Sequence, residues 1–153
     1  IAHTCIRNGQ FGIATCPAEG GTETLLIASA HHYDGTDYKP HGTLIWYNSD
    51  RGGRMDLWRI RPDGTDPEQM TRGVGDAWFP HPSPDGRHVL YLAYPPGTDG
   101  HPFGLTVTLN LMPATGGPPR ILTTLFGGQG TLNVPCWAPD SRRFAYVRYA
   151  DTN

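Results

Sequence analysis

The sequence lacks the patterns that mark helical, membrane-spanning and nucleic-acid-binding proteins. No stretch carries apolar residues at sustained spacings of three and four, so we expect almost no helix. No apolar run reaches the roughly 18 residues that a membrane-spanning helix requires. The net charge is −2, which leaves no basic field to hold a phosphate backbone. We therefore expect neither membrane insertion nor nucleic-acid binding.

Signatures of catalysis are equally sparse. The three cysteines, Cys5, Cys16 and Cys136, do not have the spacing of metal ligands, and we expect them to be ordinary half-buried side chains. No Gly-x-Ser-x-Gly motif marks a hydrolase nucleophile. The glycine-rich stretch 127–130 lacks the lysine of a phosphate-binding loop. The sequence alone therefore identifies no catalytic residue.

Turn-forming residues are abundant, with 20 glycines and 15 prolines in 153 residues. One turn recurs as Pro84-Asp85-Gly86, as Pro139-Asp140-Ser141 and, in degenerate form, as Pro40-His41-Gly42. Seven residues after each proline stands a tyrosine that we expect in a buried layer: Tyr47, Tyr91 and Tyr146. The intervals indicate a repeat of roughly 45 residues, which is typical of a four-stranded propeller blade.

A second series of turns runs in step with the first and begins at Pro17, Pro62 and Pro113. We expect the first series to join the first strand of a blade to the second, and this series to join the third to the fourth. When the sequence is aligned on these prolines, three apolar residues coincide at a position that should face the neighbouring blade: Ile13, Trp58 and Leu109.

The segments Pro82–Tyr91 and Trp137–Tyr146 resemble the TolB-type propeller repeat, which carries a Trp-Ser-Pro-Asp-Gly turn followed by an apolar strand. The Ser49-Asp50-Arg51 loop and the Asp63-Gly64 turn also match, and the resemblance extends over about 11–149. It implies a ring of six or more blades, a periplasmic or extracellular location and binding to other proteins. Related propellers shield peptidase active sites or house a polysaccharide lyase site built on a metal and histidines.

The predicted fold class is therefore all-β, with blades of four antiparallel strands and about half of a six-bladed ring. We expect one segment over 1–153, comprising partial blades at 1–30 and 127–153 and complete blades at 31–73 and 74–126. A closed propeller needs at least about four blades, and open strand edges attract other strands. Either further blades of a longer protein or a second copy of this chain would complete the ring.

Strand order divides the connections between two faces of the propeller. The tight turns lie on one face, whereas the loops between second and third strands and the crossovers between blades lie on the other, which we call the crossover-loop face. Loops on a rigid scaffold commonly carry function. The candidate ligand-binding residues are His31, His32, Asp34, Trp78, Phe79, His81, His101, Gln129 and Asn133. Tyr33 and Phe103 are further aromatic anchors.

Two groups of these residues could each have either of two roles. His31, His32 and Asp34 could supply two imidazoles and a carboxylate to a divalent ion, or could form a solvated crossover loop. His81 shares its position in the repeat with Asp37 and Cys136. These three positions would face the central channel, where they form either a small ligand site or the lining of a water-filled pore.

Three hypotheses for function follow. The first is a non-catalytic module that binds a protein, peptide or other ligand on the crossover-loop face and needs no cofactor. The second is a metal-dependent polysaccharide lyase or hydrolase, with a divalent ion held near four histidines: His31, His32, His81 and His101. The third is a self-assembling half-propeller whose partner is a second copy.

Overall fold

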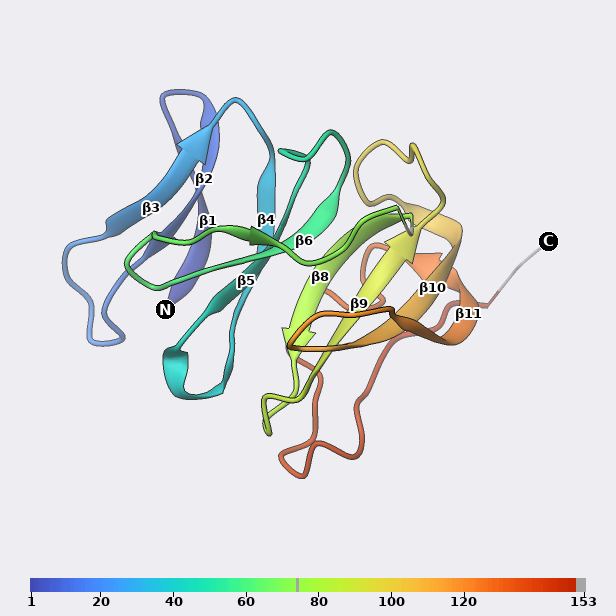
Figure 1. Cartoon of the computed structure of the whole chain (residues 1–153). Helices are drawn as coiled ribbons and strands as arrows, with labels where there is room; N and C mark the ends of the chain where they lie inside the picture. Colours follow the sequence, from blue (N-terminus) through green and yellow to red (C-terminus); the bar gives the residue numbers. More distant parts are fainter. Residues whose placement is uncertain (74, 151–153) are drawn as a thin grey trace.

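The computed structural model describes residues 1–73 and 75–150, and their strands form three antiparallel sheets arranged side by side (Figure 1). The first sheet contains β1 (Ala2–Arg7), β2 (Gln10–Thr15) and β3 (Thr24–Ser29). The second contains β4 (Tyr33–Tyr38), β5 (Ile45–Ser49), β6 (Asp56–Ile60) and β7 (Glu68–Gln69). The third contains β8 (Asp76–Pro82), β9 (His88–Tyr94), β10 (Phe103–Pro113) and β11 (Arg120–Gly128).

The prediction of an all-β chain is confirmed. The only helix among the described residues is a short 3₁₀ turn, η1 (Pro40–Gly42), and no helix there is long and apolar enough to cross a membrane. Each four-stranded sheet is a meander whose strands pair in sequence order. The expected blade boundary at residue 74 and the last three residues, 151–153, lie outside the described part of the chain.

The first sheet corresponds to a blade without its innermost strand. Strand β1 packs against β4 in the same way that β5 packs against β8, which identifies β1 as the second strand of its blade. At the other end of the chain, a single bridge joins Trp137 to Phe144 and marks the first two strands of a further blade. Both ends of the arc therefore stop within a blade.

The three Pro-Asp-Gly-like turns share a closing hydrogen bond and a positive φ at the third residue, although the second residue of the Pro40 turn, His41, also has a positive φ of 66°. In each, the residue two after the proline donates its amide to the carbonyl of the residue before the proline, over 2.8–3.0 Å. That residue has a positive φ in every copy: 66° at Gly42, 69° at Gly86 and 58° at Ser141. Glycine adopts this conformation without steric cost, and serine tolerates it less well. The degenerate copy at Pro40 is thus a true member of the series.

The alignment of the second turn series was wrong by one residue. Pro113 accepts the closing hydrogen bond of its turn, from Gly116 (3.0 Å), whereas Pro62 stands one place later because Arg61 accepts the bond from Gly64 (2.9 Å). Proline fits the first two positions of such a turn, so the sequence could not distinguish these registers.

The strand pairing shows the consequence of that shift. Tyr47 lies opposite Trp58, and Tyr91 lies opposite Asn110 rather than Leu109. Leu109 consequently faces away from the second blade, although we expected it to share the environment of Trp58.

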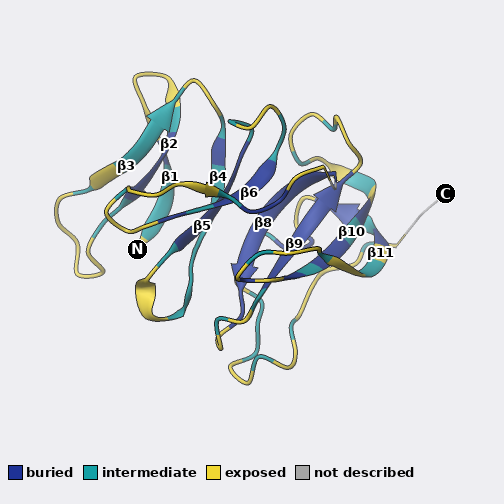
Figure 2. Cartoon of the chain, in the orientation of Figure 1, coloured by how far each residue is buried: buried dark blue, intermediate teal, exposed yellow. Residues whose placement is uncertain are grey.

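Two apolar layers hold the complete blades in place (Figure 2). Trp46 and Leu57 of the second sheet pack with Val89 and Tyr91 of the third sheet. On its other face, the second sheet packs against the first through a layer that includes Tyr47. Tyr47 and Tyr91 are fully buried, and each faces the preceding blade.

The third tyrosine of the series does not share this burial. Tyr146 is 42% exposed, which contradicts our expectation that all three tyrosines would be buried. The reason is that the C-terminal segment forms only an isolated bridge and has no complete sheet behind it.

Candidate functional site

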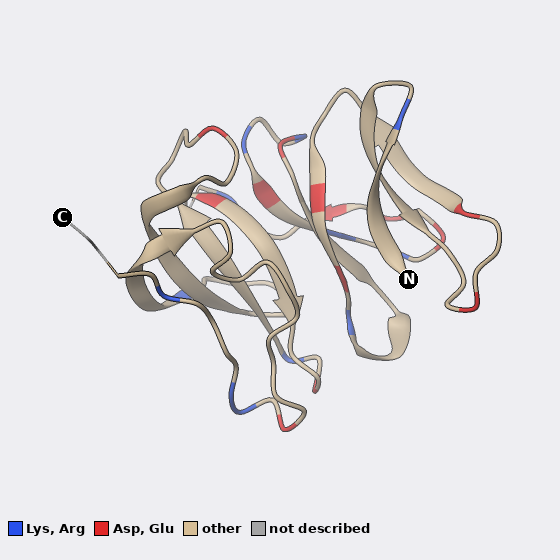
Figure 3. Ribbon diagram, turned by 180° about the vertical axis from the view of Figure 1, so that it is seen from behind, with Lys and Arg blue, Asp and Glu red and all other residues tan. Residues whose placement is uncertain are grey.

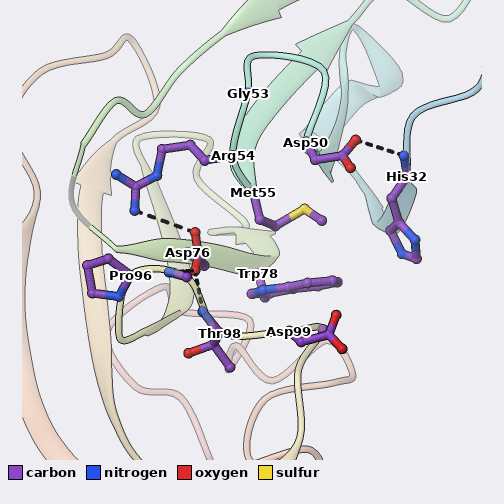
Figure 4. Close-up of a pocket in the computed structure, with 12 residues that line it drawn as sticks. His32, Asp50, Gly53, Arg54, Met55, Asp76, Trp78, Pro96, Thr98 and Asp99 are labelled. Atoms are coloured by element: carbon purple, nitrogen blue, oxygen red, sulfur yellow. Dashed lines mark hydrogen bonds and ion pairs between the residues drawn. The ribbon is translucent and has the colours of Figure 1, made fainter.

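The crossover-loop face contains an open cleft of about 840 Å³ (Figure 4). One wall is the loop that follows β5, including Asp50, Arg54 and Met55. The opposite wall is the 96–100 loop that follows β9, and Trp78 of β8 lies between them. Both walls are connections between the second and third strands of adjacent blades, so the propeller scaffold itself creates the cleft.

Asp76 fixes the wall formed by the second of these loops. This buried residue begins β8, and its Oδ2 accepts the amides of Gly97 and Thr98 at 2.7 and 3.0 Å. Its Oδ1 faces the guanidinium of Arg54 at 3.4 Å. The carboxylate accepts hydrogen bonds from two amides of the 96–100 loop and faces the guanidinium of the opposite wall. It therefore holds the two walls of the cleft at a defined separation. Asp76 is not among the ligand-binding residues predicted from the sequence.

Asp50 braces the crossover between the first two blades. Its Oδ1 accepts the backbone amide of His32 at 2.8 Å and lies 3.5 Å from Nδ1 of His31. The Asp50 side chain remains 45% exposed at the cleft. The guanidinium of Arg51 lies over the Trp58 ring at 4.9 Å. Asp50 thus orders the crossover and also presents a carboxylate to the cleft.

A compact cluster of imidazoles and aromatic rings forms the inner end of this face. Nε2 of His32 and Nε2 of His101 lie 4.0 and 3.7 Å from the same oxygen of Asp34. The His101 ring also makes edge contacts with Trp78 and Phe79, at centroid distances of 4.5 and 5.0 Å. The structure therefore brings five of the candidate residues together, two from connections (His32 and His101) and three from strands β4 and β8.

Gln129 extends this cluster and orients one of its members. Its side-chain oxygen lies within hydrogen-bond distance of Nδ1 of His101. A proton on Nδ1 donates to that oxygen and leaves Nε2 directed toward Asp34. Asn133 has a different role, because its side chain accepts the amide of Gly130 at 2.8 Å and closes a local turn.

His81 lies apart from the cleft, in β8, the first strand of its blade. The buried ring has Nδ1 3.1 Å from Asp37 and Nε2 2.8 Å from the carbonyl oxygen of Leu132. Burial raises the pKa of the neighbouring Cys136 thiol to about 11, and the charge of Asp37 adds to this rise. Both nitrogens of His81 are therefore engaged with neighbouring segments of the chain rather than with the cleft.

The structure does not bring the expected histidine and aspartate ligands into one metal site. His31 turns toward Asp50, while His32 and His101 turn toward Asp34. Within 1–73 and 75–150, no group of three or more histidine, cysteine, aspartate or glutamate side chains is placed to hold a metal ion. The two further aromatic anchors predicted from the sequence differ in their exposure. Tyr33 is buried, whereas Phe103 is exposed and stacks edge-on with Tyr149 at a centroid distance of 4.6 Å.

Asp34 should make the stability of this cluster depend on pH. Burial alone would raise its pKa, but the His32 imidazole, the Gly35 amide and the Thr4 hydroxyl outweigh burial and lower the pKa below its usual value. The folded state therefore binds the proton less readily than the unfolded state. This contribution is complete above the ordinary pKa of about 4 and is lost as the pH falls through the folded-state value.

We expect Asp34→Asn to cost about 1.5–3 kcal/mol of unfolding free energy at pH 6, the contribution of hydrogen bonds to a charged group. Urea unfolding at pH 6 and pH 3 would measure it. The difference between wild type and variant should shrink at the lower pH. An equal difference at both values would contradict the assignment of the charge to Asp34.

No protein-family model matches this chain. Its sequence is 44% identical over 144 residues to a protein of Agrobacterium fabrum (strain C58) named Uncharacterized protein Atu1656, covering 94% of this chain and 49% of that protein. Its structure matches a candidate TolB of Agrobacterium tumefaciens with a TM-score of 0.95 and 42% identity, covering 99% of this chain and 55% of the other. TolB of Acinetobacter baumannii matches at a TM-score of 0.65 and 19% identity, over 81% of this chain and 29% of the other. The chain spans about half the length of the first two of these proteins.

Proposed function

We propose that this chain, a segment of a TolB-like β-propeller, is a non-catalytic module that binds a protein or peptide on its crossover-loop face. The observation that supports this proposal is the cleft of about 840 Å³ whose two walls are joined through buried Asp76. Its volume lies in the range of about 300–1,000 Å³ that is usual for ligand sites. Because the walls are already fixed, a ligand would not bear the cost of ordering them.

The enzyme hypothesis has weaker support. Its four histidines fall into three separate environments: His31 beside Asp50, His32 and His101 beside Asp34, and His81 beside Asp37. A metal-dependent lyase or hydrolase would need several of them to converge on one ion. Binding requires no such convergence, since loops that present different side chains along a cleft are sufficient.

Because the first two matching proteins are about twice as long, the ring is proposed to be completed by further blades or by a second copy covering the open ends. The chain would act as one unit, with complete blades at 31–73 and 74–126. The likeness to structures titled TolB, together with the repeat, supports a periplasmic or extracellular location and a protein partner.

Two matched substitutions test which face binds. Thr98 lies in the cleft and its amide donates to Asp76, while Thr65 lies in a turn of the opposite face and its amide donates to Asp63. Peptides selected from a phage-displayed random library on the wild-type chain serve as ligands. We expect Thr98→Trp to weaken their binding about tenfold or more by filling the cleft, and Thr65→Trp to leave it unchanged.

The affinities would be measured by isothermal titration calorimetry, on variants whose urea unfolding matches that of the wild type. If Thr98→Trp binds as tightly as wild type, or if Thr65→Trp loses binding equally, the crossover-loop face is not the binding surface.

A further inference from the structure

We infer that the cleft selects a basic peptide segment, one whose lysine or arginine side chains meet acidic rims while its backbone carbonyls accept hydrogen bonds from the cleft interior. This inference rests on the proposed function and adds the chemistry of the ligand. It depends on the charges along the two loops and on buried donors between them.

The charged side chains that line the cleft are predominantly acidic. They comprise the aspartates at 50, 76 and 99 against the single guanidinium of Arg54. Figure 3 shows acidic positions on both loops that border the cleft, together with basic positions on the loop that follows β5. Asp76 is already satisfied by Arg54 and by two loop amides, which leaves the two outer carboxylates to set the charge seen by a ligand.

The two outer carboxylates stand on opposite walls. Asp50 is held by the His32 amide through one oxygen, so its position is defined while its side chain remains exposed. Asp99 is exposed on the loop that Asp76 anchors. Cations spaced along an extended peptide could contact both rims at once, and such complementarity steers association and confers specificity.

Two N–H groups at the edge of the cleft are buried and have no partner among the described residues. Trp78 is only 2% exposed, and its Nε1 has no hydrogen-bond partner among the described residues. Nε of Arg54 is likewise buried and unpaired there. Figure 4 shows the indole nitrogen on the Asp76 side of the cleft, beneath Met55. Buried N–H groups without partners are uncommon in native proteins. Both nitrogens are covered in this structure, so the Trp78 and Arg54 side chains must shift slightly for a carbonyl group of a ligand to satisfy them.

These two features together favour a peptide over other cations. A polyamine supplies ammonium groups but no acceptor for the indole and guanidinium N–H groups. An acidic peptide supplies carbonyls but is repelled by Asp50 and Asp99. Only a basic peptide provides both, with acceptors toward the interior and cations toward the rims.

Two nonapeptides would test the inference by calorimetry. One carries lysines spaced by glycine and serine, and the other carries glutamate in place of each lysine. The lysine peptide should bind the wild-type chain, more weakly as salt rises from about 50 to 500 mM, and the glutamate peptide should not. Asp50→Asn and Asp99→Asn should each weaken binding about two- to fivefold, and the double variant roughly four- to 25-fold.

The matched control is the double variant Asp63→Asn with Asp66→Asn, which removes two exposed carboxylates from the opposite face. It should bind like wild type. Equal binding of the two peptides, no binding of the lysine peptide, or an unaffected Asp50/Asp99 double variant would overturn the inference. Spermidine binding with the affinity of the lysine peptide would also overturn it, because the carbonyls would then be irrelevant. The comparison of Thr98→Trp with Thr65→Trp on library-selected peptides would still stand or fall independently.

Discussion

Replacing Tyr91 with alanine is expected to lower the free energy of unfolding by about 3–5 kcal/mol, the usual cost of deleting a large buried aromatic ring. Tyr91 is fully buried between the second and third sheets, where it packs with Trp46 and Leu57. Adjacent blades are held together mainly by this layer, so the cavity would open at their contact. Urea unfolding followed by tryptophan fluorescence would measure the change.

Two matched variants make this prediction specific. Tyr146 occupies the same position in the repeat but is 42% exposed, so Tyr146→Ala should cost no more than about 1 kcal/mol. The hydroxyl of Tyr91 is buried with no hydrogen-bond partner among the described residues, so Tyr91→Phe should be neutral or stabilising. Comparable losses for Tyr91→Ala and Tyr146→Ala would contradict the packing of the two blades.

Gly128→Ala is the second change with a large expected effect. Gly128 ends β11 with φ of 110°, and a Cβ there would collide with the carbonyl oxygen of Pro102 and meet the Tyr94 hydroxyl at 3.2 Å. Backbone strain of about 1–3 kcal/mol and overpacking of about 1–3 kcal/mol give an expected loss of about 2–6 kcal/mol. Thermal and urea unfolding would both report it.

Gly100 provides the control for that substitution. It also has a positive φ, 65°, but a Cβ there would meet nothing within 4 Å. Gly100→Ala should therefore cost only the conformational strain, about 1–2 kcal/mol. Equal losses at the two glycines would mean that the 101–103 segment does not approach β11 as closely as the structure shows.

The parts of the fold that could be predicted from the sequence were those fixed by local geometry. The turn at Pro84 needs a positive φ two residues later, and glycine or a tolerant residue marks it in all three copies. The turn at Pro62 was misaligned with the other two of its series because proline is compatible with two positions of such a turn, and only strand pairing distinguishes them. Register depends on contacts across the sheet, which a single sequence does not display.

The site shows the same division between local and long-range information. His32, Trp78 and His101 could be assigned to one face because strand order alone decides on which side each connection lies. The role of Asp76 could not be predicted, because its partners Gly97 and Thr98 belong to an enlarged loop about twenty residues away in the sequence. The contact between His81 and Asp37 could not be predicted either, because it joins two blades and depends on how they pack.

The most direct test of the central claim is an NMR titration of the ¹⁵N-labelled chain with a library-selected peptide. If the crossover-loop face is the binding surface, the amide signals of Gly53, Gly97 and Gly100, which line the cleft, should shift or broaden. Those of Gly64 and Gly86, in the turns of the opposite face, should remain in place. Shifts at Gly64 and Gly86 with unchanged signals from the cleft glycines would contradict the proposed function.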